Sequence, residues 1–326
     1  MSMNKKIWML GVVVLILLIF SPFWGTIRLN WQTIFANDSN SFIFWHLRVP
    51  RVLLGFVAGS ILALSGLICQ NLFKNNLATP DILGISSGAA AGAVISIKFK
   101  MHFSFFGMGS IYIFSYLGAL LAVLFVFFIA RMIKNSSLYT LLMSGVAISL
   151  FFSSIIVFFQ YIFDFSDTFS LVRWLMGGIS VAGYKEVIIL SVLLLLFLLA
   201  IFLFRREFLL ISAGDDFAQS KGLNISNFRI LSFLGLAIVV GAVVSTCGPI
   251  GFVALIVPHL SRLLGSSQYS KTVLFSIFLG GGLLVLADLV ARILIAPVDI
   301  PVGIVTSLLG APFFLFLLFA QLKKTN

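Results

Sequence analysis

The stretch VIILSVLLLLFLLAIFLF, at residues 187–204, contains no charged side chain. A helix rises about 1.5 Å per residue, so such a run crosses most of a hydrocarbon core about 30 Å thick. Similar apolar runs recur from one end of the chain to the other. A transmembrane β-barrel would instead show short segments of alternating polarity. The sequence therefore predicts an all-α polytopic membrane protein.

The overall composition is typical of the same class. Charged residues make up 10% of the chain, against roughly 25% in ordinary soluble domains, and the mean hydropathy is +1.18. We expect a single transmembrane domain over residues 1–326, because no long polar stretch interrupts it. The first apolar run, 7–24, is too long for the core of a signal peptide, and Phe23 and Trp24 are too bulky for a cleavage site. We expect it to be a retained span.

The apolar runs predict about ten membrane-spanning helices. The third is short and rich in Gly, Ala and Ser, and the eighth is interrupted by Pro249 and Pro258. The tenth contains Gly310-Ala311-Pro312 and is therefore either one rod or two half-helices. In chain order the predicted spans are 7–24, 50–72, 82–98, 109–131, 138–160, 186–205, 228–247, 249–264, 272–296 and 303–322.

The distribution of basic residues predicts the orientation in the membrane. An even number of spans leaves both termini on one side, and that side carries most of the 21 lysines and arginines. By the positive-inside rule, both termini are expected in the cytoplasm. The net charge of +11 mainly reflects this asymmetry. Because the basic residues are dispersed among the spans, we expect contact with membrane lipid and no binding to nucleic acid.

One pair of charges lies inside an apolar run. Asp288 and Arg292 are four residues apart in Ala287-Asp288-Leu289-Val290-Ala291-Arg292. Charges at membrane depth are costly and usually face a bundle interior, a water-filled path or a partner. The pair is therefore either a functional site or an ion pair that neutralises itself along one helix face.

Motifs for catalysis or for a resident cofactor are missing from the sequence. Cys69 and Cys247 each fall inside an apolar run, where a lone cysteine usually behaves as a small hydrophobe. The spacing of Cys, His and carboxylate residues does not match a metal site, and we find neither H-E-x-x-H nor a phosphate-binding G-x-x-x-x-G-K-[ST]. We expect no catalytic residue, cofactor or metal here, so any ATP-driven step needs another chain.

Glycines at four-residue spacing predict close helix packing. Gly55 and Gly59 form one such pair, and Gly84, Gly88 and Gly92 continue the spacing in the third span. Small residues at this interval let two helix backbones approach each other closely.

The longest polar interruption, Arg205 to Arg229, predicts two short helices joined at Gly214. Asp215 and Asp216 then lie at a helix N-terminus, where negative charge is favoured, and Gly222 ends the second helix. The alternative is a plain solvated loop. A loop of this length with helices of its own is more often functional.

The motifs of this chain resemble those of a known family, the iron-siderophore, haem and cobalamin permeases of ABC importers. These proteins are also called FecCD-type or type II importer permeases. The resemblance covers nearly the whole chain. One departure is visible, because the family usually has Asn-Pro-Leu-Ala where this chain has Asn75-Asn76-Leu77-Ala78. The similar segments are, in order, Leu47-Arg48-Val49-Pro50-Arg51, Gly59, Leu64-Ser65-Gly66, Gln70, Asn75 to Gly88, Gly214 to Gly222, Gly248-Pro249-Ile250-Gly251-Phe252, Val257-Pro258-His259, Arg262, Ala287-Asp288, Arg292, Ile300-Pro301-Val302-Gly303, Thr306 and Gly310-Ala311-Pro312-Phe313.

The resemblance implies a type II ABC importer permease fold, a bacterial cell membrane location and several partners. The chain would pair with a second copy or a paralogue, and the substrate path would follow the dimer interface. An extracytoplasmic binding protein would engage Arg48, Arg51 and Arg292; the alternative for each arginine is snorkelling toward lipid phosphate. Cytoplasmic ATPase subunits would bind the segment 206–227, and in particular Gly214, Asp215, Asp216, Phe217, Ala218, Gln219, Ser220, Lys221 and Gly222.

The same resemblance implies roles for two further sets of residues. An inner gate would comprise Asn75, Asn76, Leu77, Ser136, Ser137 and Thr140. Structural support would come from Asp288, Pro258, His259 and Arg262.

The function implied is that of a permease subunit in an ATP-driven importer for iron chelates. Ferric siderophore is the first expectation for the substrate, and haem or cobalamin is the alternative. The other function considered is a secondary transporter or channel that works without an ATPase. That class would carry a path of titratable acidic residues, whereas Asp288 is nearly the only acid within the apolar runs.

Overall fold

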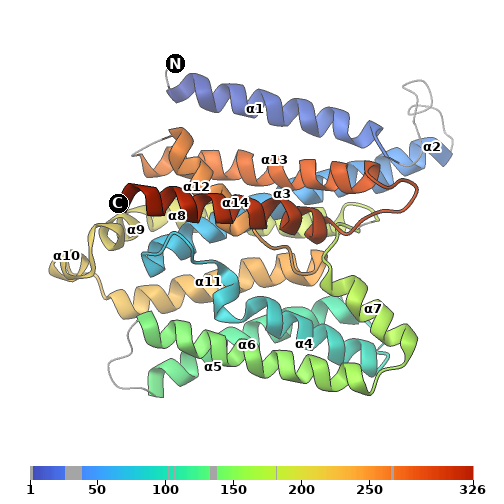
Figure 1. Ribbon diagram of the computed structural model, residues 1–326, viewed down its shortest axis with the longest axis horizontal. Helices are drawn as coiled ribbons and strands as arrows, with labels where there is room; N and C mark the ends of the chain where they lie inside the picture. Colours follow the sequence, from blue (N-terminus) through green and yellow to red (C-terminus); the bar gives the residue numbers. More distant parts are fainter. Residues whose placement is uncertain are drawn as a thin grey trace. The chain divides into compact units, whose positions relative to one another are not determined.

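The computed structural model describes residues 3–25, 39–101, 103–105, 107–132, 138–180, 182–265 and 268–325 (Figure 1). Almost all of its regular structure is helical, as predicted, and one short antiparallel strand pair accompanies the helices. The elements, in order, are α1 (Met3–Phe20), η1 (Ser21–Phe23), α2 (Ser39–Phe42), η2 (Ile43–Arg48), α3 (Val49–Phe73), η3 (Pro80–Leu83), α4 (Ile85–Lys98), β1 (Ser104–Phe105), β2 (Met108–Gly109), α5 (Ser110–Met132), α6 (Leu138–Tyr161), α7 (Phe165–Leu175), α8 (Lys185–Leu203), α9 (Arg205–Ala213), α10 (Asp215–Ser220), α11 (Ile225–Cys247), α12 (Val253–Gly265), α13 (Tyr269–Ile293) and α14 (Val302–Thr325).

Two compact units make up the chain. Unit 1 contains Met1–Leu67, Met176–Leu194 and Ile250–Asn326, and unit 2 contains Ile68–Leu175 and Leu195–Pro249. Two boundaries between the units fall inside helices, one in α3 and one in α8. Each of these two helices therefore contributes residues to both units.

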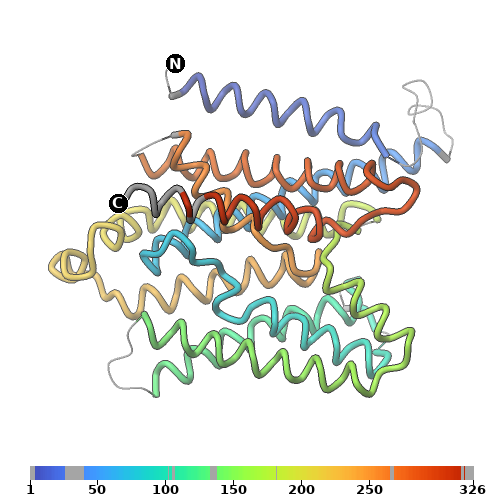
Figure 2. Tube along the Cα trace, viewed as in Figure 1, coloured from blue at the N-terminus to red at the C-terminus, as the bar shows by residue number. Residues whose placement is uncertain are grey.

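In unit 1, α13 packs against α1, α12 and α14. The predicted close approach at Gly59 is confirmed, because a Cβ atom there would collide with the carbonyl group of Gly280 on α13. Both chain ends lie at the same end of this unit, and the connection between α13 and α14 lies at the opposite end (Figure 1). In Figure 2, α13 and the beginning of α14 form a hairpin in orange and red.

In unit 2, α4 packs against α5 and α6, and α11 packs against α5. Gly88 and Gly92 confirm the predicted small-residue face of α4. A Cβ atom at Gly88 would collide with the carbonyl group of Gly118, and one at Gly92 would collide with that of Phe114. The two helices approach at backbone distance there because α4 presents no side chain at either glycine.

The predicted spans correspond closely to the observed helices. Within the described residues, seven helical segments are long and apolar enough to cross a membrane: Asn4–Phe23, Asn40–Phe73, Ser110–Met132, Leu138–Tyr161, Lys185–Leu203, Ile225–Cys247 and Tyr269–Ile293. Three shorter apolar helices, Ile85–Lys98, Val253–Leu264 and Val302–Phe316, match the third, eighth and tenth predicted spans. The chain is a multi-pass membrane protein.

The three irregular spans differ in detail from the prediction. The third helix begins at Ile85, after predicted residue 82, because Gly84 has a left-handed φ of 77° that separates it from η3. The eighth begins at Val253, after predicted residue 249. The tenth is one continuous helix through Pro312, which decides between one rod and two half-helices.

Neither α2 with η2 nor α7 was predicted from the sequence. Between the fifth and sixth spans, α7 has a polar face and an apolar face on which Leu171 is fully buried. Its apolar residues recur at helical spacing, which is the signal that could have predicted it.

Candidate docking and coupling sites

The intramembrane carboxylate of Asp288 binds two arginines. Its Oδ1 accepts a hydrogen bond of 2.9 Å from Nε of Arg51, and its Oδ2 lies 3.0 Å from Nε of Arg292. The Asp288 side chain is 1% exposed. Asp288 and Arg292 form the ion pair that was one of the two alternatives, and α3 supplies a second cation that the spacing of the pair did not predict. A buried charge needs such partners because desolvation is costly.

Arg48 and Arg292 are buried and bind the short turn η1. Nη1 of Arg48 donates to the carbonyl oxygens of Pro22 at 3.1 Å and Phe23 at 3.2 Å. Arg292 donates from Nη1 to Trp24 O at 2.8 Å and from Nη2 to Ser21 Oγ at 2.9 Å. Carbonyl groups at a helix end lack intrahelical partners, and the guanidinium groups satisfy them. Both guanidinium groups are therefore directed to the protein backbone at η1.

Arg51 is the most accessible of the three arginines expected to dock a binding protein. Its side chain is 19% exposed, and its Nη1 lies 2.8 Å from Oδ2 of Asp299, which is 43% exposed. The sequence analysis did not single out Asp299. Its position directly before Ile300-Pro301 was the available signal, because this motif begins the tenth span.

The coupling segment contains the two short helices that the sequence predicts. α9 and α10 are joined at Gly214, whose φ of 140° and ψ of 147° are strained for any residue with a Cβ atom. Gly222, with φ at 83°, follows α10. Phe217 is exposed on α10 and Leu209 on α9, while Ala218 is buried.

Asp215 binds two cations from separate elements of unit 2. Its carboxylate lies 2.7 Å from Nζ of Lys74 and accepts two 3.0 Å hydrogen bonds from Nη2 of Arg229. Burial raises the pKa of Asp215, but the hydrogen bonds and positive charges of Lys74 and Arg229 together lower it by more, so the pKa lies below its ordinary value. The carboxylate is therefore ionised at neutral pH.

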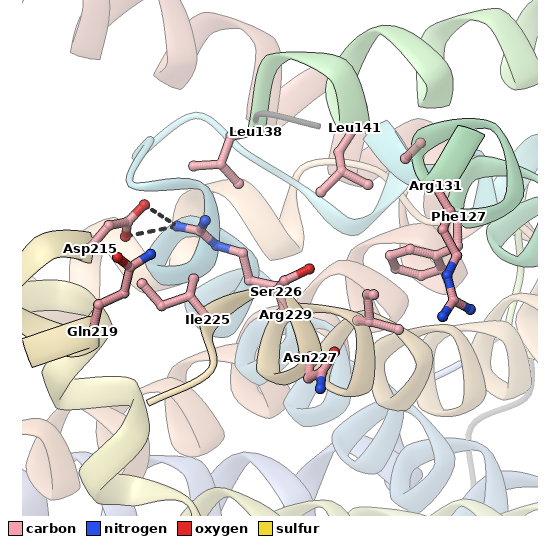
Figure 3. A pocket seen from close by; sticks show the side chains of 12 residues that line it. Phe127, Arg131, Leu138, Leu141, Asp215, Gln219, Ile225, Ser226, Asn227 and Arg229 are labelled. Carbon is pink, nitrogen blue, oxygen red and sulfur yellow. Dashed lines mark hydrogen bonds and ion pairs between the residues drawn. The ribbon is translucent and has the colours of Figure 1, made fainter. Parts of the chain in front are cut away.

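A pocket of about 370 Å³ adjoins this carboxylate (Figure 3). Figure 3 shows the Arg229 guanidinium pointing to Asp215, with Leu138 and Leu141 of α6 on another wall. The pocket thus separates the coupling segment from the beginning of α6. Its lining residues are Phe127, Ala130, Arg131, Leu138, Leu141, Asp215, Gln219, Ile225, Ser226, Asn227, Arg229 and Ile230.

The expected gate residues lie in two places. Asn75 forms a tight turn after α3, in which its Oδ1 accepts a hydrogen bond of 2.9 Å from Leu77 N. This turn forms although the chain has Asn76 where the family usually has proline. Thr140 lies in the first turn of α6. Ser136 and Ser137 lie outside the described residues.

The remaining expected support residues share one helix. Pro258, His259 and Arg262 all belong to α12, and Pro258 is buried inside it. Among the residues that the structure describes, we find no group of three or more His, Cys, Asp or Glu side chains that could hold a metal ion.

The chain is similar to known transport proteins over nearly its whole length. One relative, from Helicobacter pylori and named "Probable iron chelatin transport system permease protein", is 36% identical over 300 residues, which are 91% of this chain and 89% of the relative. The hemin transport system permease protein HmuU of Yersinia pestis is 36% identical over 328 residues, which are 98% of this chain and 97% of the relative.

The fold agrees with these similarities. A solved structure described as a metal-chelate type ABC transporter in an inward-facing conformation matches this chain with a TM-score of 0.86 at 30% identity, and the match covers 98% of this chain and 99% of the other. The sequence profile of the FecCD transport family matches residues 13–320. By these matches, the chain belongs to the FecCD transport family.

Proposed function

We propose that this chain is the membrane-spanning permease subunit of an ABC importer for an iron chelate. The family match over residues 13–320 carries this proposal. The substrate proposed first is a ferric siderophore, with haem and cobalamin as alternatives. The similar proteins support this class of substrate, because one is named for iron chelatin and another for hemin.

The proposed partners follow from the family. Two ATPase subunits hydrolyse ATP in the cytoplasm and bind the segment 206–227, where the exposed Phe217 and Leu209 offer apolar contacts. A second permease copy or a paralogue completes the substrate path at the dimer interface. Transport follows an alternating-access cycle in which ATP binding moves the coupling segment and the inner gate. The permease itself carries out no covalent chemistry.

The proposed docking site for an extracytoplasmic binding protein centres on Arg51. Guanidinium groups form charge-assisted hydrogen bonds with carboxylates, so the binding protein would present acidic residues. Arg48 and Arg292 would support this surface through their contacts with residues 21–24. The proposed docking residues Arg51 and Arg292 belong to the beginning of α3 and the end of α13, which lie at the end of unit 1 opposite both chain ends (Figure 1). This supports a cytoplasmic location for both termini.

Reconstitution tests the proposed function. The chain is purified in detergent together with its ATPase subunits and placed in proteoliposomes with the cognate binding protein. Uptake is then measured with a labelled ferric siderophore, haem and cobalamin. We expect uptake of one of them that requires both ATP and the binding protein. If the chain never retains an ATPase, or if uptake proceeds without ATP, the importer proposal is wrong and a secondary transporter or channel takes its place.

A docking variant tests the proposed binding surface. We expect Arg51→Gln to weaken binding-protein affinity by about tenfold, because charge-assisted pairs with carboxylates are strong. Asp288 still has Arg292 beside it in this variant. The matched control is Arg173→Gln on α7, outside the proposed surface. Unchanged affinity in Arg51→Gln would remove the docking role.

A further inference from the structure

The carboxylate of Asp215 joins three segments of unit 2 that are separate in the sequence. Asp215 is the first residue of α10, Lys74 follows the last residue of α3, and Arg229 lies in the first turns of α11. A single side chain therefore links the coupling segment to the end of one membrane helix and to the beginning of another.

Lys74 is held in an unusual backbone conformation directly before the expected gate loop. Its φ is 50°, in the left-handed region that few residues other than glycine adopt. The next residue, Asn75, closes the turn to Leu77. Any displacement of the Lys74 backbone therefore reaches the Asn75–Leu77 turn within one residue.

A second contact ties the same end of α3 to the coupling segment. Nδ2 of Asn71 donates a hydrogen bond of 3.2 Å to the carbonyl oxygen of Phe208 on α9. Asn71 thus binds α9 and Lys74 binds α10. The two contacts lie on opposite sides of Gly214. A change in the angle between α9 and α10 would therefore shift Asp215, and with it Lys74, relative to Asn71.

On the other side, the coupling segment is packed firmly against α11. The ring of Phe228 meets that of Phe208 edge to face at 5.1 Å, and that of Phe204 at 5.9 Å. Arg229 is mostly buried, whereas the side chains of Lys74 and Asp215 are each about one third exposed. The contact with Lys74 is therefore the more compliant of the two ion pairs.

We propose that Asp215 is a positioning residue that passes movement of the coupling segment to the gate loop through Lys74, with Arg229 holding the carboxylate in place. This inference rests on the proposed function, because it assumes that an ATPase moves α9 and α10. Ion pairs with exposed members contribute little to stability, since solvent screens them. The 2.7 Å contact nevertheless links α10 directly to the residue that precedes the gate loop.

A double-mutant cycle in the complete transporter tests this role. Lys74→Met, Asp215→Asn and the double variant are reconstituted with the ATPase and the binding protein, and substrate imported per ATP hydrolysed is measured. We expect each single variant to lower this ratio by about tenfold, and we expect Lys74→Met, which lies outside the ATPase-binding segment, to retain ATPase binding and hydrolysis. We expect the double variant to be no worse than either single variant, because both remove one interaction.

Two further variants separate the charge contact from a general disturbance. Lys74→Arg is expected to recover most of the import per ATP, because its guanidinium also reaches the carboxylate. Lys100→Met is the matched control, since Lys100 is another exposed lysine with a positive φ, of 43°, after a helix end.

The outcomes distinguish this inference from the proposed function. If the unaltered complex imports substrate with ATP and Asp215→Asn imports equally per ATP, the inference is overturned and the proposed function stands. If Asp215→Asn fails to assemble, Lys74→Met carries the test, and normal import per ATP in that variant also overturns the inference. If the unaltered complex shows no ATP-driven import, the proposed function itself is wrong.

Discussion

At the scale of single residues, the buried charges of Asp288, Arg48 and Arg292 lie against charged or polar partners. Asp288 has Arg51 and Arg292 beside it, and Arg48 and Arg292 are buried against residues 21–24. A buried ion contributes to stability only through such partners, and removing one partner leaves the others uncompensated. Asp288 therefore stabilises this end of unit 1 by pairing with arginines of both α3 and α13.

Replacing Asp288 is expected to be strongly destabilising. Asp288→Ala leaves two guanidinium groups without a buried carboxylate, at a cost of about 3–5 kcal/mol. Asp299→Asn, which removes an exposed partner of the same Arg51, is expected to cost less than about 1 kcal/mol. Thermal unfolding in detergent compares the two variants, and equal unfolding temperatures would refute the structural role of Asp288.

Asp299 is expected to compete with the binding protein for Arg51. It occupies the Nη1 edge of Arg51 at 2.8 Å, and a carboxylate of the partner would need the same edge. If Arg51 is the docking residue, Asp299→Asn raises the affinity for the binding protein by several-fold, because an intramolecular competitor is removed. Titration of the binding protein onto the complex in detergent measures this, and a weaker affinity would show that Asp299 itself contacts the partner.

The ion pairs of Asp215 are expected to be insensitive to physiological pH. A carboxyl group with a lowered folded-state pKa stabilises the fold above its unfolded pKa and loses this effect as the pH falls through the folded value. For Asp215 that window lies below the ordinary value of 3.8. The uptake ratio of Asp215→Asn to the unaltered protein should therefore stay constant from about pH 8 down to about pH 5.5; a ratio that rises toward one over this range would disagree.

At the scale of elements, glycine decides where helices meet and where they stop. Gly59 and Gly88 lack a side chain and so allow close backbone contacts with α13 and α5. Gly84 and Gly214 instead separate consecutive helices by their backbone angles. The four-residue spacing correctly predicted close backbone contacts at Gly59, Gly88 and Gly92, whereas the nearest atoms at Gly55 and Gly84 belong to side chains. It did not predict that Gly84 ends η3, because spacing alone carries no information about φ.

Alanine substitutions at two glycines should have opposite effects. Gly88→Ala is expected to destabilise by about 1–3 kcal/mol or more, since its Cβ atom would collide with the carbonyl group of Gly118 and the α4–α5 contact would have to widen. Gly235→Ala on α11 meets open space and is expected to be neutral or slightly stabilising. Thermal unfolding measures both, and a stabilised Gly88→Ala would contradict the packing of α4 against α5.

At the scale of the whole molecule, seven helices among the described residues are long and apolar enough to cross a membrane, and three further apolar helices are shorter. If all ten cross, both termini lie on one side of the membrane. Both chain ends lie at one end of unit 1 (Figure 1). Together with the distribution of basic residues, this supports cytoplasmic termini. A reagent that cannot cross membranes should label cysteines introduced at Lys5 and Lys323 only in inside-out vesicles, and one at Lys100 only in right-side-out vesicles. Labelling of residues 5 and 100 from the same side would reject this topology.

The sequence by itself determined the class of protein, the approximate spans and the helix–Gly214–helix form of the coupling segment. These features depend on the local lengths of apolar runs and on single glycines. The thickness of the bilayer determines how long a span must be, and backbone sterics determine where glycine is needed. Only the tertiary structure showed that Arg51 joins Asp288, that η1 covers Arg48 and Arg292, and that Asp215 meets Lys74 and Arg229. Arg51 and Asp288 are 237 residues apart in the chain. Such contacts depend on which helix faces pack together, and no periodicity within one segment encodes that choice.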